Sequence, residues 1–535
     1  MTDLSSALNY SKKDRKEFLD AGWWNDDTPN KWVTKWAKER PDAPIAISMD
    51  LTLTYKEVQE GANRFAAGLL NLGFKKGDVI GFQLPNIPEI LIAYLGIQAF
   101  GAVPSLMHMP YRATELEPLL NHVEAKGVVC LAAGDAYDAP ATFEALKVTV
   151  PSLETVIVVG EDAPSRAVSY ADLIATEPVE LADPPSADDP AMICFTSGTS
   201  AAPKAVVHPY RTIMASARYG LEDMNYTPDD VILCAPSFTH AFGVMITLTA
   251  LAAGSASPMM PVYTPPALAE LIKYTKATAL CCGPAHVLAG KVGGLWDVEY
   301  TETLKYIYMG GATCTPEVMH TIEESCPNGK ALQIWGMTET MMPILLPLDA
   351  NFEDRKKYLG TPPIGHEVRA VDEDGNILGP GEEGELEYRG PFLFASYYLN
   401  DKANASSFTE DGWFKTGDMV IIDEGDNVAM TGRVKDIINR GGIKINPLDI
   451  EILLDERLDV LQSAMVPMPD KLLGERACLF LVMAPDKTMT LDNVREFLNS
   501  KDIMKVKWPE RLEIIDAMPI TVTRKVIKGR LVEML

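Results

Sequence analysis

The chain has 535 residues, of which 47% are hydrophobic and 23% are charged. This composition excludes wholesale disorder, and the length predicts two or more domains. A formal net charge of −26 argues against nucleic acid or an anionic membrane as the partner, so an anionic ligand would need a local cluster of cations and N–H donors.

The N-terminus, Met1-Thr2-Asp3-Leu4, lacks the basic and then apolar pattern of a signal peptide, and we expect a cytoplasmic protein. The eight cysteines are scattered along the chain, without a Cys-x-x-Cys pair or a Cys/His cluster of zinc spacing. We therefore expect buried free thiols rather than disulfides or a metal site.

The first motif along the chain is FTSGTSAAPKAVVH, at residues 195–208. The apolar run 191–195 predicts a buried strand before it, and a helix is predicted from Tyr210. A loop of small residues between a strand and a helix exposes backbone N–H groups and can hold phosphate, although such clusters are also common in ordinary turns. It is not the common P-loop, because Pro203 precedes the lysine. The candidate phosphate ligands are Thr196, Ser197, Gly198, Thr199, Ser200 and Lys204.

Strand-like and helix-like segments alternate through most of the chain, which predicts α/β layers. Residues 231–235 and 304–309 are expected to form buried strands, and Thr315-Pro316-Glu317 is typical of a helix start. The uncharged run 241–269 is interrupted from Gly254 onward, so it predicts a buried helix rather than a membrane span. After about residue 370, short strands with turn signals are expected.

Five further segments place glycines, acids or a lysine next to predicted strands. They read YMGGATCTPE (308–317), QIWGMTETMMP (333–343), GWFKTGDM (412–419), GRVKDIINRGGIKINPLDIE (432–451) and PITVTRKVIKGRL (519–531). With the first motif, and in this order, they resemble the ANL superfamily of adenylate-forming enzymes, which includes acyl- and aryl-CoA ligases, peptide-synthetase adenylation domains and luciferases. The resemblance extends from Leu53-Thr54-Tyr55 to Lys525.

The resemblance implies the ANL fold: a large α/β domain with a β-rich subdomain, at residues 1–434, and a small mobile α+β domain at 435–535. It also implies an ATP site. The 196–200 loop would surround the β- and γ-phosphates, Thr338 would bind the α-phosphate, and Glu339 would coordinate Mg²⁺, which favours one carboxylate with phosphates. The remaining implied ATP-binding residues are Gly310, Gly311 and Ala312 beside adenine, Trp335 stacked on it, Gly336, Met337, and Asp418 with Arg433 at the ribose.

Lys525 matches the lysine that the family uses for adenylation. A carboxylate that attacks the α-phosphorus brings two anions together, and a cation supplied in the reacting state would stabilise that charge. The implied catalytic set is Lys525, Thr338, Glu339 and His240. The sequence departs from the family at Ala201, Ala205 and Arg524, where glycine is usual, and at Trp335, where tyrosine is usual. None of these changes removes a reacting group.

The segment APSFTHAFGVM (235–245) matches the family segment that lines the acid pocket. No acidic residue occurs between Cys234 and Ala269, which argues against an α-amino acid as substrate. We expect a small hydrophobic carboxylic acid: alicyclic, aromatic or medium-chain. The expected pocket residues are Phe238, His240, Phe242, Gly243, Met309, Gly310, Trp335, Met341 and Met342.

The acceptor of the acyl group is expected to be CoA. The segment INRGGIKINPLDIE resembles alicyclic and aryl acid–CoA ligases of the cyclohexanecarboxylate-CoA-ligase type, and also freestanding aryl-acid ligases that load a separate carrier protein. The resemblance assigns Lys435 to the hinge and Gly441, Gly442 and Lys444 to the CoA step. We expect a monomer or homodimer without nucleic acid or a membrane span. A binding protein without turnover remains the competing class.

Overall fold

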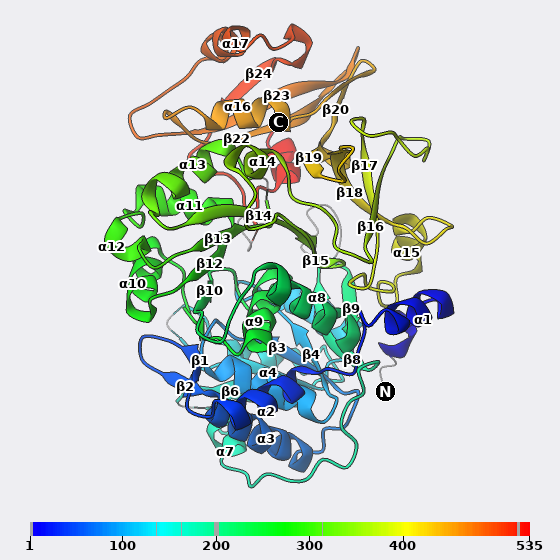
Figure 1. Ribbon diagram of the computed structural model, residues 1–535, viewed down its shortest axis with the longest axis vertical. Coiled ribbons are helices and arrows are strands. Elements are labelled where there is room, and N and C mark those ends of the chain that lie inside the picture. Colours follow the sequence, from blue (N-terminus) through cyan, green and yellow to red (C-terminus); the bar gives the residue numbers. More distant parts are fainter. Residues whose placement is uncertain (1–3, 135, 162, 197–202, 313, 522–524) are drawn as a thin grey trace.

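The structure is a computed structural model that describes residues 4–134, 136–161, 163–196, 203–312, 314–521 and 525–535. Figure 1 shows two α/β layers in the lower and middle parts of the molecule, with the yellow β-rich subdomain to the right of the middle layer and the orange and red C-terminal part at the top. The α/β layers expected from the alternating sequence patterns are confirmed.

The N-terminal part of the chain forms a seven-stranded sheet in the order β7-β6-β5-β3-β4-β8-β9. All neighbours are parallel except β8 and β9. Both faces are covered, as parallel sheets require: Val129 joins one hydrophobic cluster, and its neighbours Val128 and Cys130 join another. The strands are β3 (Val79–Gln83), β4 (Val103–Leu106), β5 (Gly127–Leu131), β6 (Thr155–Val159), β7 (Val168–Ser169), β8 (Pro190–Phe195) and β9 (Ala205–Pro209).

A second sheet of five strands has the order β10-β12-β13-β14-β15, with only β14 and β15 antiparallel. The carboxyl ends of its parallel strands carry several of the sequence motifs. Its strands are β10 (Ile232–Cys234), β12 (Ala279–Cys282), β13 (Tyr306–Met309), β14 (Lys330–Met337) and β15 (Met341–Leu345). A small sheet in the order β11-β1-β2 lies beside it, formed by β1 (Pro44–Ile47), β2 (Thr52–Thr54) and β11 (Ser257–Pro258).

Four helices contribute most of the helical side chains of one hydrophobic core, which also contains residues of both large sheets. They are α3 (Tyr55–Asn71), α4 (Glu89–Ala99), α8 (Tyr210–Asp223) and α9 (Ala241–Ala253). Helix α9 carries no charge and is buried nearly throughout, and it ends at Gly254 in the left-handed conformation (φ +74°). The prediction of a buried helix here is confirmed, and no helix in the described parts of the chain is long and apolar enough to cross a membrane.

The outer faces of the two sheets carry further helices. Beside the seven-stranded sheet lie α5 (Ala113–His122) and α6 (Ala139–Leu146), whose leucines and Phe143 join its second cluster. The five-stranded sheet packs against α10 (Pro265–Thr275), α11 (Pro284–Val292) and α13 (Pro316–Ser325). Shorter or peripheral elements are η1 (Leu4–Leu8), α1 (Lys12–Asp20), α2 (Pro29–Glu39), α7 (Tyr170–Ile174), α12 (Val298–Thr301) and α14 (Phe352–Lys357).

After residue 366 the chain forms an antiparallel sheet, as the turn-rich sequence predicted. Its strands are β16 (Glu367–Val371), β17 (Glu383–Arg389), β18 (Phe414–Ile422) and β19 (Val428–Arg433), with α15 (Asp401–Ser407) before β18. The register of β18 and β19 sets Asp418 opposite Arg433. This pairing brings two of the predicted ribose-binding residues together.

The C-terminal part begins at η2 (Val434–Asp436) and has hydrophobic clusters of its own. No cluster among the described residues combines side chains from before and after η2. Its sheet has the order β21-β20-β23-β22, with β24 beside β23. The elements are β20 (Ile438–Arg440), β21 (Ile443–Ile445), α16 (Leu448–Asp455), β22 (Val460–Asp470), β23 (Gly474–Met483), α17 (Leu491–Ser500), η3 (Lys505–Lys507), β24 (Arg511–Ile514) and α18 (Lys528–Glu533).

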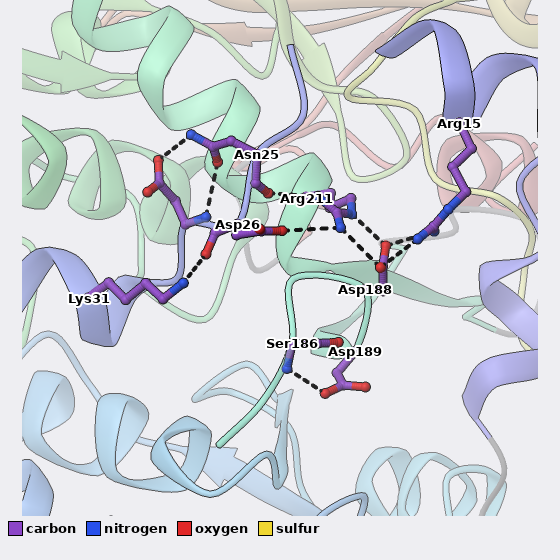
Figure 2. A network of polar contacts seen from close by, with 9 residues as sticks. Arg15, Asn25, Asp26, Lys31, Ser186, Asp188, Asp189 and Arg211 are labelled. Atoms are coloured by element: carbon purple, nitrogen blue, oxygen red, sulfur yellow. Dashed lines mark hydrogen bonds and ion pairs between the residues drawn. The ribbon is translucent and has the colours of Figure 1, made fainter. Parts of the chain in front are cut away.

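A polar network fastens the N-terminal segment to the core (Figure 2). Asp188, two residues before β8, receives hydrogen bonds from Arg211 on α8 and from Arg15 on α1, the latter at 2.7 Å. Arg211 also donates to the backbone oxygen of Asn25 at 2.8 Å. Partial burial opposes ionisation of Asp188, but the two arginines outweigh it and lower its pKa to about 2. The network thus joins α1 and α8 to the segment that leads into β8, the strand before the predicted phosphate loop.

Strand β9 corrects one prediction. The loop after β8 was expected to run directly into a helix, but Ala205–Pro209 forms a strand antiparallel to β8 before α8 begins. Val206 and Val207 are fully buried there, since β-branched side chains pack well in a covered sheet. The expectation for the thiols is confirmed, because all eight cysteines are free and buried.

Candidate active site

The two ends of the predicted phosphate loop are fixed to each other. Thr196 donates its N–H to the backbone oxygen of Lys204 at 3.0 Å, and the N–H of Lys204 donates to Oγ1 of Thr196 at 3.2 Å. The predicted loop residues Ser197, Gly198, Thr199, Ser200 and Ala201 lie outside the described residues. Thr196 and Lys204 both line the cavity described below.

Thr338 and Glu339 occupy the hairpin between β14 and β15. The backbone oxygen of Thr338 accepts a hydrogen bond from Nε2 of the buried His208, on β9, at 2.8 Å. Glu339 is only 5% exposed, and its Oε1 accepts the hydroxyl of Tyr397 at 2.7 Å. Strand β9 and the segment around Tyr397 therefore fix both residues of the motif.

The same hairpin requires a glycine. A Cβ atom on Gly336 would lie 1.9 Å from the backbone oxygen of Met341, so no other residue fits. Met341 itself has φ +57°, an uncommon conformation for a side chain of this size. This tight turn brings Met341 and Met342 to the cavity wall.

Asp418 is 1% exposed and lies between an arginine and a tryptophan. Its Oδ2 accepts the indole N–H of Trp335 at 2.9 Å, and Nε of Arg433 lies 2.9 Å from Oδ1 in an ion pair. Oδ1 accepts no hydrogen bond of acceptable geometry from the described residues. A buried carboxylate oxygen in this state can accept a hydrogen bond from a ligand hydroxyl.

Trp335 was expected to stack on adenine, but its side chain lies elsewhere. Its ring belongs to the hydrophobic cluster with Ile344 and Val420, outside the cavity lining, so this arrangement gives it no face for adenine. The period of two along β14 turns its side chain away from the cavity that Ile334 and Gly336 line. Its contact with the site passes through Asp418.

Lys525 brings the C-terminal part of the chain into the site. Burial and the charge of Arg433 lower the pKa of Lys525 to about 8, against the opposing effect of Asp418. Thr521 donates its N–H to the backbone oxygen of Lys525 at 2.7 Å, and the N–H of Lys525 donates to Oγ1 of Thr521 at 3.0 Å. Arg524 lies outside the described residues.

Gly310 and Gly311, directly after β13, form the part of the cavity wall that faces Lys525. Gly311 has φ +83°, and a Cβ there would lie 3.8 Å from Cε of Lys525. A Cβ on Gly310 would approach the backbone oxygen of Ile334 to 3.0 Å, which is closer than most side chains pack. Gly310, Gly311 and Ala312 all line cavities.

His240 stands at the N-terminus of α9. Its Nδ1 accepts the N–H of Phe242 at 3.2 Å, and its ring stacks on His108 at 5.9 Å. Burial, His108 and Lys525 hold the pKa of His240 well below its usual value, so the imidazole is neutral. Because Nδ1 accepts a hydrogen bond, the proton of the neutral ring is on Nε2.

Some predicted pocket residues are core residues instead. Phe238 packs against Tyr94, with ring centroids 5.1 Å apart, and lines neither cavity. Met309 is buried in the cluster beneath α13. Gly243 is packed against the backbone of Ser237, where a Cβ would lie 1.9 Å from the oxygen. The faces of α9 and β13 decide the positions of Gly243 and Met309, and the turn before α9 decides that of Phe238; a motif match resolves none of these.

Two adjoining cavities collect the site residues. The first has a volume of about 450 Å³, and the second about 330 Å³. They share His240, Phe242, Gly310, Gly311 and Lys525. The first is also lined by Thr196, Lys204, Ala241, Ile334, Gly336, Met337, Thr338, Glu339, Met341, Met342, Glu385, Thr416, Gly417, Asp418, Arg433, Val434 and Lys435.

The predicted hinge residue lies at the first cavity, whereas the predicted CoA-step residues lie outside both cavities. Lys435, in η2, reaches the first cavity. Gly441 and Gly442 have φ +61° and +88° in the turn between β20 and β21, and they line neither cavity. Lys444 forms an ion pair with Glu373 across the two parts of the chain.

Several residues of the site were not predicted from the sequence, among them His108, His208, His286 and Tyr397. His108 and His286 line the second cavity, while His208 and Tyr397 hold Thr338 and Glu339. Tyr397 lies 58 residues beyond Glu339 in the chain, so no local spacing connects the two. His208 is the last residue of the motif at 195–208, and its place there was the signal that could have found it.

The chain is similar to known proteins over most of its length. The family described as "AMP-binding enzyme" matches residues 33–398. A 2-hydroxy-7-methoxy-5-methyl-1-naphthoate–CoA ligase from Streptomyces carzinostaticus is 30% identical, over 96% of this chain and 94% of its own length. A medium-chain fatty-acid–CoA ligase from Escherichia coli is 28% identical, over 98% of this chain and 94% of its own. A salicyl-AMP ligase / salicyl-S-ArCP synthetase from Mycobacterium tuberculosis is 29% identical, over 96% and 92%.

Solved structures share the fold over nearly the whole chain. ATP-bound MatB from Rhodopseudomonas palustris has a TM-score of 0.85 at 25% identity, covering 94% of this chain and 98% of that one. The anthranilate–CoA ligase AuaEII in complex with anthranoyl-AMP has a TM-score of 0.86 at 20% identity, covering 96% and 97%. Because AuaEII is only 20% identical, its similarity to this chain concerns the fold alone.

Proposed function

The chain belongs to the AMP-binding enzymes and is an adenylate-forming acid–thiol ligase, and we propose that it joins a hydrophobic carboxylic acid to CoA through an acyl-AMP intermediate. The observation that carries this proposal is the meeting of Lys525 with Glu339 and Asp418 in one cavity, from which a second cavity continues. The acid, ATP and a thiol each have a candidate place there.

We assign the first cavity to ATP and the acid. Asp418 Oδ1 would accept hydrogen bonds from the ribose hydroxyls, with Arg433 beside it, and Gly310 and Gly311 would form a flat wall for adenine, with Ala312 next to them in the second cavity. Thr196, Lys204 and Thr338 would bind the phosphates, together with the loop residues 197–200. Cations and N–H donors gathered in this cavity would offset the net charge of −26.

Glu339 suits a divalent cation that arrives with ATP. It is a buried carboxylate on the cavity wall, and no group of three or more His, Cys, Asp or Glu side chains in the described chain could hold a metal alone. Mg²⁺ is commonly held by one or two carboxylates and substrate phosphates, which fits this donor set. When bound, the ion would neutralise phosphate charge; Glu339 would orient it.

Lys525 would act in the first half-reaction. A carboxylate oxygen of the acid attacks the α-phosphorus, and the bond from that phosphorus to pyrophosphate breaks. The Lys525 ammonium would stabilise the charge that gathers on the α-phosphate. Its pKa of about 8 leaves it mainly protonated at neutral pH.

The lining favours an apolar acid. Ala241, Phe242, Ile334, Met341 and Met342 line the first cavity, and methionines adapt to varied shapes. The run 235–269 offers no carboxylate for a substrate ammonium. The relatives' printed substrates, a medium-chain fatty acid and aromatic acids, support alicyclic, aromatic or medium-chain acids.

The second cavity supports a separate thiol acceptor. It joins the first at His240 and Lys525, so a thiol that enters there would approach the acyl carbonyl from a side that ATP does not fill. Attack of the thiol sulfur would form the thioester and release AMP. We favour CoA; the alternative, a carrier protein, is supported by the relative named as a salicyl-S-ArCP synthetase.

We also propose that the small domain, residues 435–535, moves between the two half-reactions about Lys435. The separate hydrophobic clusters on either side of η2 support a boundary at residue 434. Gly441, Gly442 and Lys444 lie away from both cavities here, so they would approach the site only after such a motion.

The test is pyrophosphate release from ATP with a panel of carboxylic acids, run with and without CoA. We expect hydrophobic acids to exceed every amino acid, and thioester to form only with CoA. Lys525→Ala should lower pyrophosphate release by orders of magnitude, while acyl-AMP supplied directly is still converted by CoA. No turnover with any acid would instead indicate a binding protein, and thioester on a carrier but not on CoA would select the alternative.

A further inference from the structure

Tyr397 belongs to no sequence motif, yet it is attached to the strand that follows the phosphate loop. It lies between β17 and α15 and is 2% exposed. Its backbone pairs with Val206 in an isolated antiparallel bridge, and the N–H of Tyr398 donates to the oxygen of Ala205 at 3.0 Å. This segment therefore lies alongside β9, the strand that starts directly after Lys204.

The same segment holds Glu339 at two points. The N–H of Phe394 donates to the backbone oxygen of Glu339 at 2.9 Å, and the Tyr397 hydroxyl donates to its Oε1 at 2.7 Å. A hydrogen bond to a carboxylate is charge-assisted and fixes its direction. Among the described residues, Oε2 of Glu339 accepts no hydrogen bond, so one oxygen is held and the other faces the cavity.

The face of the tyrosine ring meets a cation. Nζ of Lys204 lies 4.0 Å from the ring centroid, within the range of a cation–π contact. Burial lowers the pKa of Lys204, and the charge of Glu339 opposes that shift. The Tyr397 side chain thus contacts Lys204 through its ring and Glu339 through its hydroxyl.

We propose that Tyr397 is a positioning residue that sets Glu339 and Lys204 relative to each other, so that the free carboxylate oxygen meets the divalent cation of the bound nucleotide. The inference rests on the proposed function, because it concerns nucleotide binding at Glu339. It predicts that the hydroxyl acts on metal affinity, separately from the ring.

A purely structural tyrosine would behave differently. The segment has other anchors: Tyr10 donates to the oxygen of Leu393 at 2.9 Å, and Trp24 donates to that of Pro391 at 2.8 Å. None of them uses the Tyr397 hydroxyl. Removal of that oxygen should therefore leave the segment in place and change only what it holds.

The experiment uses Tyr397→Phe, which keeps the ring and its contact with Lys204. Free Mn²⁺ is measured by electron paramagnetic resonance while it is titrated into the full-length protein with a non-hydrolysable ATP analogue. We expect Mn²⁺ affinity in this complex to fall about tenfold, the scale of a lost hydrogen bond to a charged group. Binding of the analogue without metal should be unchanged. Tyr398→Phe, the same change at the next residue, is the matched control and should bind Mn²⁺ as wild type does.

A double-mutant cycle with Glu339→Gln tests the route of the effect. If Tyr397 acts through Glu339, adding Tyr397→Phe to Glu339→Gln should weaken Mn²⁺ binding no further. Equal Mn²⁺ affinity in Tyr397→Phe and wild type, or fully additive losses in the cycle, would overturn the inference and leave the proposed function intact. Failure of the wild-type protein to bind Mn²⁺ with the analogue would overturn both.

Discussion

Trp335 donates its indole N–H to Oδ2 of Asp418 at 2.9 Å, and both side chains are buried. The indole supports the carboxylate from the core side, so Oδ1, beside Arg433, is the oxygen that can serve a ligand. The tryptophan at a position where the family usually has tyrosine is therefore connected to the nucleotide site through a hydrogen bond.

Replacing Trp335 by phenylalanine should test this connection. The variant keeps an aromatic ring in its cluster but leaves Oδ2 of Asp418 without its donor, at a cost of about 1–3 kcal/mol. We expect KM for ATP to rise about tenfold with a smaller change in kcat, measured by pyrophosphate release. An unchanged KM for ATP in a normally folded variant would show that the indole only fills the core.

The pKa of Lys525 predicts an alkaline limb in the rate. Since the pKa is about 8, and the ammonium is the form that stabilises phosphate charge, kcat/KM for ATP should fall as pH rises above about 8. Lys525→Arg should be slower but should lose this limb, because arginine stays charged. A limb that persists unchanged in the arginine variant would assign it to another group.

The extent to which the sequence predicted this site depends on how local each relationship is. Thr338, Glu339, Asp418 and Lys525 were found because each lies in a contiguous motif, and the structure brings all four to one cavity. Tyr397 was not found, because its contact with Glu339 depends on how the segment before α15 packs on β9. Phe238, in the turn before α9, and Met309, at the end of β13, were assigned to the pocket, but both side chains pack in hydrophobic clusters.

The same distinction between local patterns and contacts of distant segments applies to the fold. The alternating strand and helix patterns predicted the layers, and the neutral run 241–269 predicted the buried helix α9. The short strand β9 was missed, since five residues adjoining a helix give little periodic signal, and it becomes a strand by pairing with β8.

Asp188 should stabilise the protein in a pH-dependent manner. Its folded pKa of about 2 is below the unfolded value of about 3.9. The stabilisation is therefore present above pH 4 and is lost as the pH falls from about 4 to about 2. Asp188→Asn should lower the free energy of unfolding by about 1 kcal/mol at pH 7, a value reduced for the partial exposure of the carboxylate.

Thermal unfolding from pH 7 down to pH 3 measures this effect. The difference in Tm between wild type and Asp188→Asn should shrink as the pH falls below about 4. The control is Asp20→Asn, which removes an exposed ion pair with Lys16 on α1. This variant should change Tm little at any pH. A Tm difference for Asp188→Asn that is constant with pH would mean that its contribution is not electrostatic.

Lys435 provides the test of domain motion. It lies in η2, a 3-10 turn, where φ is typically −50° to −70°. Proline fixes φ near −65°, so Lys435→Pro should favour the present arrangement, in which Lys525 reaches the first cavity. Acyl-AMP formation should then be retained, while conversion of acyl-AMP to thioester should fall by orders of magnitude, because it requires η2 to change conformation. Single-turnover assays measure the two steps separately, and Lys435→Ala, which removes the charge without restricting φ, should retain both. Equal loss of both steps in the proline variant, or loss of neither, would contradict a hinge at this residue.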